Sequence, residues 1–266
     1  MRNKFDMQLD YLNEQLIHNG RIMLRFAINR ATEALQHGSM EEAKEVISAD
    51  EEIDQMEKDI ERLCLKLLLQ QQPVARDLRQ ISAALKMITD MERIGDQASD
   101  IAEIIISEKK SEGAEIPKIG KMSEAVAKMV RDSVTAYVKK DLELSRSVME
   151  ADDAVDTLFE ENKRDLIEFI AQNKGDAGRE TIDLIMVAKY LERIGDHATN
   201  IAEWVEFSIT GITKRVKYRQ SQCRKKCKER LMIFCVEDDS NIRELVVYTL
   251  ETTGFKARAS RTGEVS

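Results

Sequence analysis

The chain has 266 residues, which is enough for one large or two ordinary domains that each bury a core. Its 2 prolines, 11 glycines, 5% aromatic residues and 34% charged residues are typical of long packed helices. The N-terminus lacks the apolar core of a signal peptide, and no uncharged apolar run approaches the roughly 18 residues of a membrane span. We therefore expect a cytoplasmic protein whose four cysteines are reduced thiols.

The net charge of -8 is unevenly distributed along the chain. Residues 212–266 hold 13 of the 41 basic and 7 of the 49 acidic residues, a net charge of +6, whereas residues 1–211 carry -14. This change of charge indicates that two different kinds of sequence meet near residue 212.

In residues 1–211 the apolar residues recur with helical spacing, and the alternation typical of strands is absent. Breaks fall at segments that contain glycine or proline, and Ser39 is a suitable N-cap because Glu41 and Glu42 follow it. The pattern predicts an all-α fold with six helices, over about 4–37, 39–70, 73–107, 120–139, 141–172 and 179–210.

Two segments of this region are nearly identical. DMERIGDQASDIAE (90–103) and YLERIGDHATNIAE (190–203) share nine residues at a constant offset of 100, and VISADEEID (46–54) aligns with VMEADDAVD (148–156) at an offset of 102. The repetition predicts a tandem of two three-helix bundles with short turns between antiparallel helices. We place the boundaries at 1–110 for the first bundle, 111–211 for the second, 212–231 for a basic linker and 232–266 for the tail.

Each repeat carries carboxylates at helical spacing. At about 100° per residue, Glu92, Asp96, Asp100 and Glu103 fall within an arc of about 80°, opposite the apolar side of their helix. The second copy has Asn200 at the third position. The preceding helix of each repeat carries a further series: Asp50, Asp54, Glu57 and Glu61 in the first repeat, and Asp152, Asp156 and Glu160 in the second.

Carboxylates stacked on facing helices repel one another and favour compensation by cations. The alternatives are a solvated acidic surface, neutralisation by arginine or lysine, and bound metal. Oxygen ligands suit hard or borderline ions such as Mg, Ca, Mn or Fe, and Zn is a further candidate. The candidate metal ligands are Asp50, Asp54, Glu92, Asp96, Asp100, Asp152, Asp156, Glu192, Asp196 and Asn200.

Gly95 and Gly195 lie inside predicted helices, where glycine costs about 1 kcal/mol relative to alanine. Their equivalent positions predict a close backbone approach, or reflect only a shared ancestor. A ferritin-like oxidase would need Glu-x-x-His on two helices, and that motif is absent, as are a nucleophile set and a phosphate-binding glycine loop. We therefore do not expect an enzyme.

The repeated ERIGD-x-A-x-x-I-A-E, with QQPVARDLRQI (71–81) and FDMQLDYL (5–12), resembles the PhoU family of phosphate-signalling regulators over about residues 4–211. The resemblance implies tandem three-helix bundles, often dimeric. It also implies an adaptor that contacts membrane complexes peripherally: the ATPase subunit of the phosphate ABC transporter and a sensor histidine kinase. Such an adaptor keeps the phosphate regulon off when phosphate is plentiful.

Some members of that family bind metal clusters, commonly iron. Carried over, their acidic motifs fall on Asp50/Asp54 with Glu92/Asp96 and on Asp152/Asp156 with Glu192/Asp196. The second half departs from the QQPVARDLR pattern, because NKGDAGRET (173–181) stands there instead. The leading hypothesis is thus a regulatory adaptor, and the alternative is a metal-dependent or metal-storing helical protein.

The last part of the chain, MIFCVEDDSNIRELVVYTLETTGFKARA (232–259), predicts a strand, a helix and a second strand. It resembles the start of a response-regulator receiver domain of the PhoB type, whose Mg²⁺ pocket would fall on Glu237, Asp238 and Asp239. A fragment of three elements cannot cover both faces of its strands. We expect a truncated, non-functional receiver-like tail, joined to the rest by a frameshift or a lost stop codon.

Residues 214–230 hold nine basic residues and one acid. A nucleic-acid or membrane-binding patch is a third hypothesis for the chain. We expect no nucleic-acid partner, so deletion of 212–266 should leave regulation intact.

Overall fold

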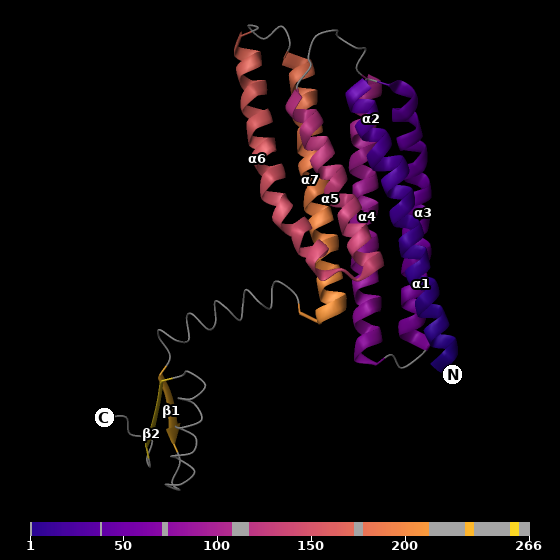
Figure 1. Cartoon of the computed structure of the whole chain (residues 1–266), viewed down its shortest axis with the longest axis vertical. Coiled ribbons are helices and arrows are strands. Elements are labelled where there is room, and N and C mark those ends of the chain that lie inside the picture. The colour runs from indigo at the N-terminus through magenta and orange to yellow at the C-terminus, as the bar shows by residue number, and fades with distance from the viewer. Residues whose placement is uncertain are drawn as a thin grey trace. The chain divides into compact units, whose positions relative to one another are not determined.

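The computed structural model describes residues 2–37, 39–70, 74–107, 117–172, 178–212, 232–236 and 256–260. The chain divides after Gly211 into two compact units. In its described residues the first unit is all-helical, as predicted (Figure 1). Its elements are α1 (Arg2–Ile22), a π-helical segment η1 (Met23–Asn29), α2 (Arg30–His37), α3 (Met40–Gln70), α4 (Ala75–Ser107), α5 (Pro117–Lys139), α6 (Leu142–Gln172) and α7 (Gly178–Thr210).

The prediction of one regular α-helix over 4–37 is wrong in its middle, where η1 separates α1 from α2. A π-helical turn takes in an extra residue and shifts the side chains that follow. Apolar side chains nevertheless remain buried through the segment, among them Met23, Ala27 and Ile28. The apolar spacing alone therefore did not reveal the change of helix type.

The turn between α5 and α6 explains why these two helices are antiparallel neighbours. Lys140 has a φ of 51°, the left-handed conformation that commonly ends a helix. The backbone N–H of Asp141 donates to the carbonyl of Ala136 at 2.9 Å. The Asp141 Oδ1 atom then accepts the N–H of Leu144 at 3.0 Å and caps α6. Because only Lys140 and Asp141 separate α5 from α6, the two helices run antiparallel.

The duplication is visible in the element bounds. Helices α3 and α6 each span 31 residues and begin 102 positions apart, and α4 and α7 each span 33. Pro117 begins α5 at the first helical position, where its missing N–H costs nothing. The first repeat is thus built from α1 to α4, including η1, and the second from α5 to α7.

The two repeats share one hydrophobic core. Helix α4 packs against α7, and α5 packs against α1, η1 and α2. The contact of α1 with α5 is close, because a Cβ added to Gly20 would lie 2.8 Å from Val134 Cγ1. Buried side chains from both repeats therefore belong to a single cluster.

The second unit contains two described strands, β1 (Met232–Val236) and β2 (Lys256–Ser260). They pair in parallel, with Met232 opposite Lys256 and Val236 opposite Ser260. The predicted helix between them, the acidic residues Glu237, Asp238 and Asp239, and the basic segment 214–230 lie outside the described residues. Among the described helices, none is both long and apolar enough to cross a bilayer.

Candidate metal centre and its counterpart in the second repeat

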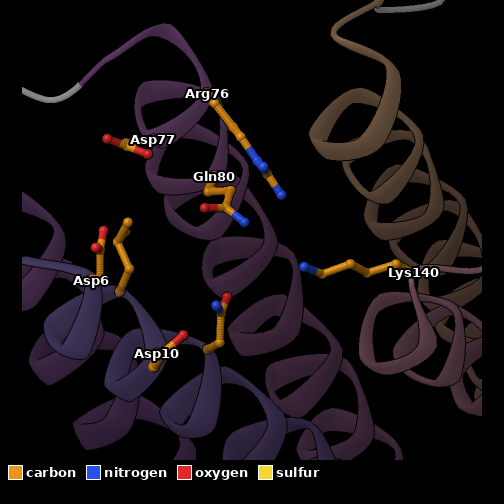
Figure 2. A pocket seen from close by; sticks show the side chains of 8 residues that line it. Asp6, Asp10, Arg76, Asp77, Gln80 and Lys140 are labelled. Atoms are coloured by element: carbon orange, nitrogen blue, oxygen red, sulfur yellow. The ribbon is translucent and has the colours of Figure 1, made fainter. Parts of the chain in front are cut away.

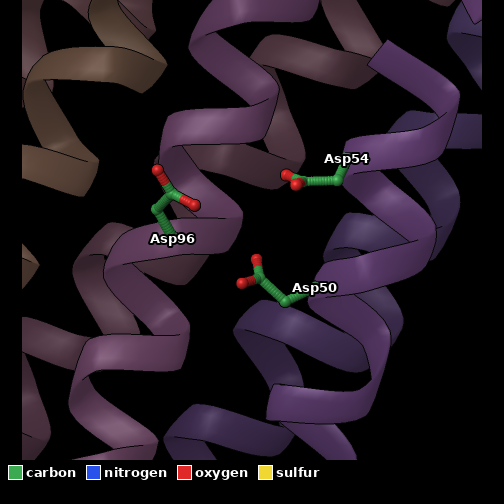
Figure 3. Close-up of side chains that lie close together, drawn as sticks. All are labelled: Asp50, Asp54 and Asp96. Carbon is green, nitrogen blue, oxygen red and sulfur yellow. The ribbon is translucent and has the colours of Figure 1, made fainter. Parts of the chain in front are cut away.

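Three predicted carboxylates of the first repeat converge between α3 and α4. Asp50 and Asp54 extend from α3 toward Asp96 of α4 (Figure 3). One ligand atom of each lies within 4.8 Å of the other two. Metal–oxygen bonds of about 2.0–2.6 Å are long enough for oxygens at such a spacing to share one cation. In the described part of the chain, no other trio of acidic, histidine or cysteine side chains is this compact.

Gly95 lets the two helices approach at this point. A Cβ at Gly95 would lie 3.1 Å from Asp50 Oδ1 and 3.3 Å from Ile53 Cδ1, closer than most side chains pack. The predicted close approach is therefore confirmed at Gly95. At Gly195 the nearest atom, Val155 Cγ1, would be 3.4 Å from an added Cβ, which is ordinary contact. The space around position 195 would therefore also admit the Cβ of alanine.

The carboxylates of the first repeat resist ionisation. Burial, followed by the charges of Asp96, Asp54 and Asp100, raises the pKa of Asp50 to about 6. Burial, followed by Asp96, raises the pKa of Glu92 to about 7, although the Arg93 guanidinium opposes the shift. Burial, followed by the charges of Asp54 and Asp100, raises the pKa of Asp96, and the Arg93 charge lowers it.

One oxygen of this group has no partner of its own. Asp50 Oδ1 is buried and accepts no hydrogen bond. A buried carboxylate oxygen without a donor is costly, and a bound cation would satisfy it. The donor set and this orphan oxygen together fit a hard or borderline metal ion.

Two of the predicted ligands face the junction of the repeats. The amide Nδ2 of Asn200 donates to Asp90 Oδ1 at 3.2 Å, and His197 Nδ1 lies 2.9 Å from the same oxygen. Asp100 lies close enough to Tyr190 for its negative charge to raise the pKa of that phenol, after the larger effect of burial. At an offset of 100, the contact of Asp100 with Tyr190 is the symmetric counterpart of Asp90 with Asn200.

In the second repeat the predicted ligands also lie near one another, but under different conditions. The pKa of Asp196 is raised by burial, then by the charges of Glu192, Asp152 and Asp156. Lys189 lowers it, and its Nζ atom lies 2.5 Å from Glu192 Oε2. The second group of acids therefore contains a cation supplied by the chain itself.

The sequence comparison missed this lysine and its surroundings. Lys189 and Lys163 both lie over the ring of Phe159, with Nζ-to-centroid distances of 5.3 and 5.4 Å. At the offsets of the repeat, Lys189 stands where the first repeat has Thr89, and Phe159 where it has Glu57. A comparison of the positions at which the two repeats differ would have indicated Lys189 and Phe159. The prediction used only the positions at which the repeats are identical.

Glu160, which we placed in the second acidic series, is not the counterpart of Glu57 or Glu61. The offset of 102 aligns it with Lys58, and its carboxylate lies 2.5 Å from Lys163 Nζ. It is an exposed residue paired on its own helix.

A polar pocket of about 250 Å³ lies elsewhere, among α1, the start of α4 and the α5–α6 turn (Figure 2). Asp6 and Asp10 extend from α1 on one side, and Arg76 and Lys140 enter from the other. Because both signs of charge line the pocket, a free multivalent anion would meet carboxylates as well as cations. Its lining residues are Asp6, Leu9, Asp10, Asn13, Arg76, Asp77, Gln80 and Lys140.

Comparisons with known proteins match this arrangement. The family model described as the PhoU domain matches residues 23–105 and 119–205. A phosphate-specific transport system accessory protein PhoU homolog from Clostridium acetobutylicum is 37% identical over 215 residues, covering 79% of this chain and 96% of that protein. A homolog of the same name from Aquifex aeolicus is 39% identical, covering 71% and 86%.

Solved structures agree with the sequence matches. The crystal structure of PhoU from Pseudomonas aeruginosa superposes with a TM-score of 0.75 at 32% identity, covering 78% of this chain and all of that one. The phosphate transport system regulatory protein PhoU from Streptococcus pneumoniae gives 0.72 at 25% identity, covering 79% and 98%.

Proposed function

This chain belongs to the PhoU family, and we propose from that premise that it is a regulatory adaptor that lowers phosphate uptake and phosphate-regulon signalling in the cytoplasm. The observation that carries the proposal is the family match across both repeats, joined to relatives named as accessory proteins of phosphate-specific transport. The partners we propose are the ATPase subunit of the phosphate ABC transporter and a sensor histidine kinase. We propose no catalytic role and no nucleic-acid partner.

Such an adaptor would act by binding one state of its partner more tightly than another. A ligand shifts a conformational equilibrium only to the extent of its differential affinity for the two states. Helices of 31 and 33 residues offer long rigid surfaces for this purpose. Homodimer formation would double these surfaces, and light scattering on the purified chain would measure it.

We further propose that the first-repeat carboxylates hold a metal ion, with iron the leading candidate and Zn, Mn, Mg or Ca the others. Asp50, Asp54 and Asp96 would be the ligands, with Glu92 beside them. A bound cation supplies positive charge that relieves the mutual repulsion of these acids. It would also fasten α3 to α4, which carry the ligands.

The same carboxylates favour the second hypothesis, a metal-dependent or metal-storing protein. That hypothesis requires turnover or the release of many equivalents of metal. Assays of iron oxidation and of iron loading distinguish it from an adaptor, which would show neither.

A genetic experiment tests the adaptor directly. In a bacterium whose own gene of this family is deleted, a phosphate-regulated promoter is expected to stay active in high phosphate. Expression of the full chain, or of residues 1–211, should restore repression, and an Asp50→Asn/Asp96→Asn variant should restore it less well. Folded protein that leaves the promoter fully active would refute the adaptor role.

We keep the receiver-like character of residues 232–266 as a hypothesis. The parallel pairing of β1 with β2 is compatible with the start of such a domain. Equal repression by the full chain and by residues 1–211 is the expected result if the tail has no regulatory function.

A further inference from the structure

Equivalent positions beside the carboxylates differ between the two acidic groups: Glu160 adds an acid in place of Lys58, whereas three other pairs make the second repeat more positive. The offsets of 102 for α3 and α6 and of 100 for the ERIGD helices define these pairs. In each of those three pairs the second repeat replaces a neutral or acidic residue by a basic or aromatic one. The three pairs are Glu57 and Phe159, Glu61 and Lys163, and Thr89 and Lys189.

The Lys189 ammonium is held at the acids of the second repeat by two contacts. Its Nζ atom is 2.5 Å from Glu192 Oε2, and the Glu192 side chain is only 16% exposed. The same atom lies 5.3 Å from the centre of the Phe159 ring, a distance at which a cation is attracted to the aromatic face. Lys163 lies over the same ring at 5.4 Å.

The first repeat offers no such cation at the equivalent positions. Thr89 directs its hydroxyl to the backbone carbonyl of Leu85 at 3.2 Å and brings no charge. In place of the aromatic ring stands Glu57, whose carboxylate adds to the repulsion felt by Glu92. The first repeat has a looser compensation, because Lys58 Nζ lies 3.7 Å from Asp54 Oδ2 and the Arg93 charge lowers the pKa of Glu92 and of Asp96. In the second repeat the ammonium of Lys189 is closer to its carboxylate, at 2.5 Å, and also lies over an aromatic ring.

A divalent cation entering the second group would lie a few ångströms from the Lys189 ammonium. Repulsion between like charges at such a distance is strong in a partly buried site. The metal would also have to compete with Lys189 for the Glu192 carboxylate. In the first repeat the obstacle is weaker, because Lys58 lies 3.7 Å from Asp54 and is 54% exposed. The trio of Asp50, Asp54 and Asp96 is compact.

We infer that Lys189, seated on Phe159, is an internal counter-ion that takes the place of metal in the second repeat, so that the chain binds metal through its first repeat alone. This inference rests on the proposed metal role of the first-repeat carboxylates. It assigns different tasks to two sites that the sequence motif makes look identical. The first becomes the metal-responsive site, and the second a copy in which Lys189 occupies the Glu192 carboxylate.

The test exchanges the residues that differ. Mn²⁺ binding to the full chain, prepared without chelator, is counted by equilibrium dialysis and by loss of the electron paramagnetic resonance signal of free Mn²⁺. Wild-type binding should be lost in Asp50→Asn/Asp96→Asn and kept in Asp152→Asn/Asp196→Asn. The variant Phe159→Glu/Lys189→Thr should bind about twice as many equivalents as wild type, and Glu57→Phe/Thr89→Lys should bind none.

A matched control removes another lysine. Lys128→Thr makes the same change of charge as Lys189→Thr, but Lys128 pairs with Asp132 on α5 and lies 74% exposed. It should leave the number of bound ions unchanged. Circular dichroism of each variant verifies the helical fold, which is needed for Phe159→Glu because Phe159 is partly buried and packs against the core.

The outcomes separate this inference from the proposal on which it depends. Wild-type protein that loses half its Mn²⁺ in Asp152→Asn/Asp196→Asn overturns the inference and leaves the metal role intact. A chain that binds no Mn²⁺ as wild type or as the Phe159→Glu/Lys189→Thr variant overturns both. Metal confined to the first repeat, with a second site gained by the exchange, supports both.

Discussion

At the scale of single residues, Gly95 and Gly195 show how equivalent positions acquire different constraints. Replacing glycine by alanine within a helix contributes up to about 1 kcal/mol of stability when the new methyl group has room. At Gly195 the nearest atom would be 3.4 Å away, whereas at Gly95 Asp50 Oδ1 would be at 3.1 Å. The first glycine is part of the acidic site, and the second is not constrained in this way.

We expect Gly195→Ala to raise the free energy of unfolding by up to about 1 kcal/mol. Gly95→Ala should give no gain or a loss, because Asp50 and Ile53 must move away, and it should weaken Mn²⁺ binding. Urea denaturation and Mn²⁺ titration of the two variants measure these effects. A Gly95→Ala protein that is stabilised as much as its counterpart and binds metal normally would contradict the assigned contact.

The raised pKa values of Asp50 and Glu92 predict how stability depends on pH. Both carboxyl groups bind protons more tightly in the folded chain, at pKa values of about 6 and about 7, than in the unfolded chain, where about 4 is normal. Their stabilising contribution is therefore complete below pH about 4 and is lost as the pH rises through 6 and 7. Metal-free protein should become less stable between pH 5 and pH 8.

Urea denaturation in the presence of a chelator, at several pH values, measures this slope. Glu92→Gln should flatten it, because the amide does not ionise. Glu150→Gln, which alters an exposed glutamate of α6, is the matched control and should not. An unchanged slope in Glu92→Gln would mean that this carboxyl group does not titrate in the proposed range.

At the scale of elements, the contact between α4 and α7 joins the repeats through buried polar groups. Asp90 and His197 are 7% and 9% exposed, and Asp90 Oδ1 lies within hydrogen-bonding distance of both His197 and Asn200. Neither α3 nor α6 takes part. This contact therefore ties one repeat to the other without using the acidic groups.

Asp90→Ala should lower the free energy of unfolding by about 1–3 kcal/mol, because the buried His197 and the Asn200 amide lose their shared acceptor. Asp90→Asn keeps an acceptor oxygen and should cost less. Ser82→Ala, at an exposed position of α4, serves as the control in the same urea denaturation. If Asp90→Ala unfolds at the same urea concentration as the control, the polar contact contributes nothing to the joining of the repeats.

At the scale of the whole molecule, the single core predicts that both repeats unfold together. Trp204, the only tryptophan of the chain, lies in α7 with its ring 5.7 Å from that of Phe207. Its fluorescence reports on the second repeat, whereas far-ultraviolet circular dichroism reports on all helices. The two probes should give coincident urea transitions. Separate midpoints would show that the repeats are independent domains.

Much of the described architecture of the helical unit was predictable, because long apolar stripes interrupted by glycine and proline leave few alternatives. Helices α3 and α6 end at the residues expected, Gln70 and Gln172. The π-helical segment was missed since buried residues continue through it. Lys189 was not predicted for a different reason: it lies outside the residues that the two repeats share.

The sequence by itself determined the helices, the duplication and the acidic series, because each is a local periodicity or a repeated string of residues. It could not determine which carboxylates meet, since helical spacing fixes the side of a helix but not the neighbour that side faces. The family resemblance had paired Asp50 and Asp54 with Asp96, which the structure brings together. Only the tertiary structure turned Asn200 toward Asp90 and placed Lys189 between Glu192 and Phe159. Contacts between helices that are far apart in the sequence determine which side chains become neighbours. Such contacts leave no local pattern in the sequence.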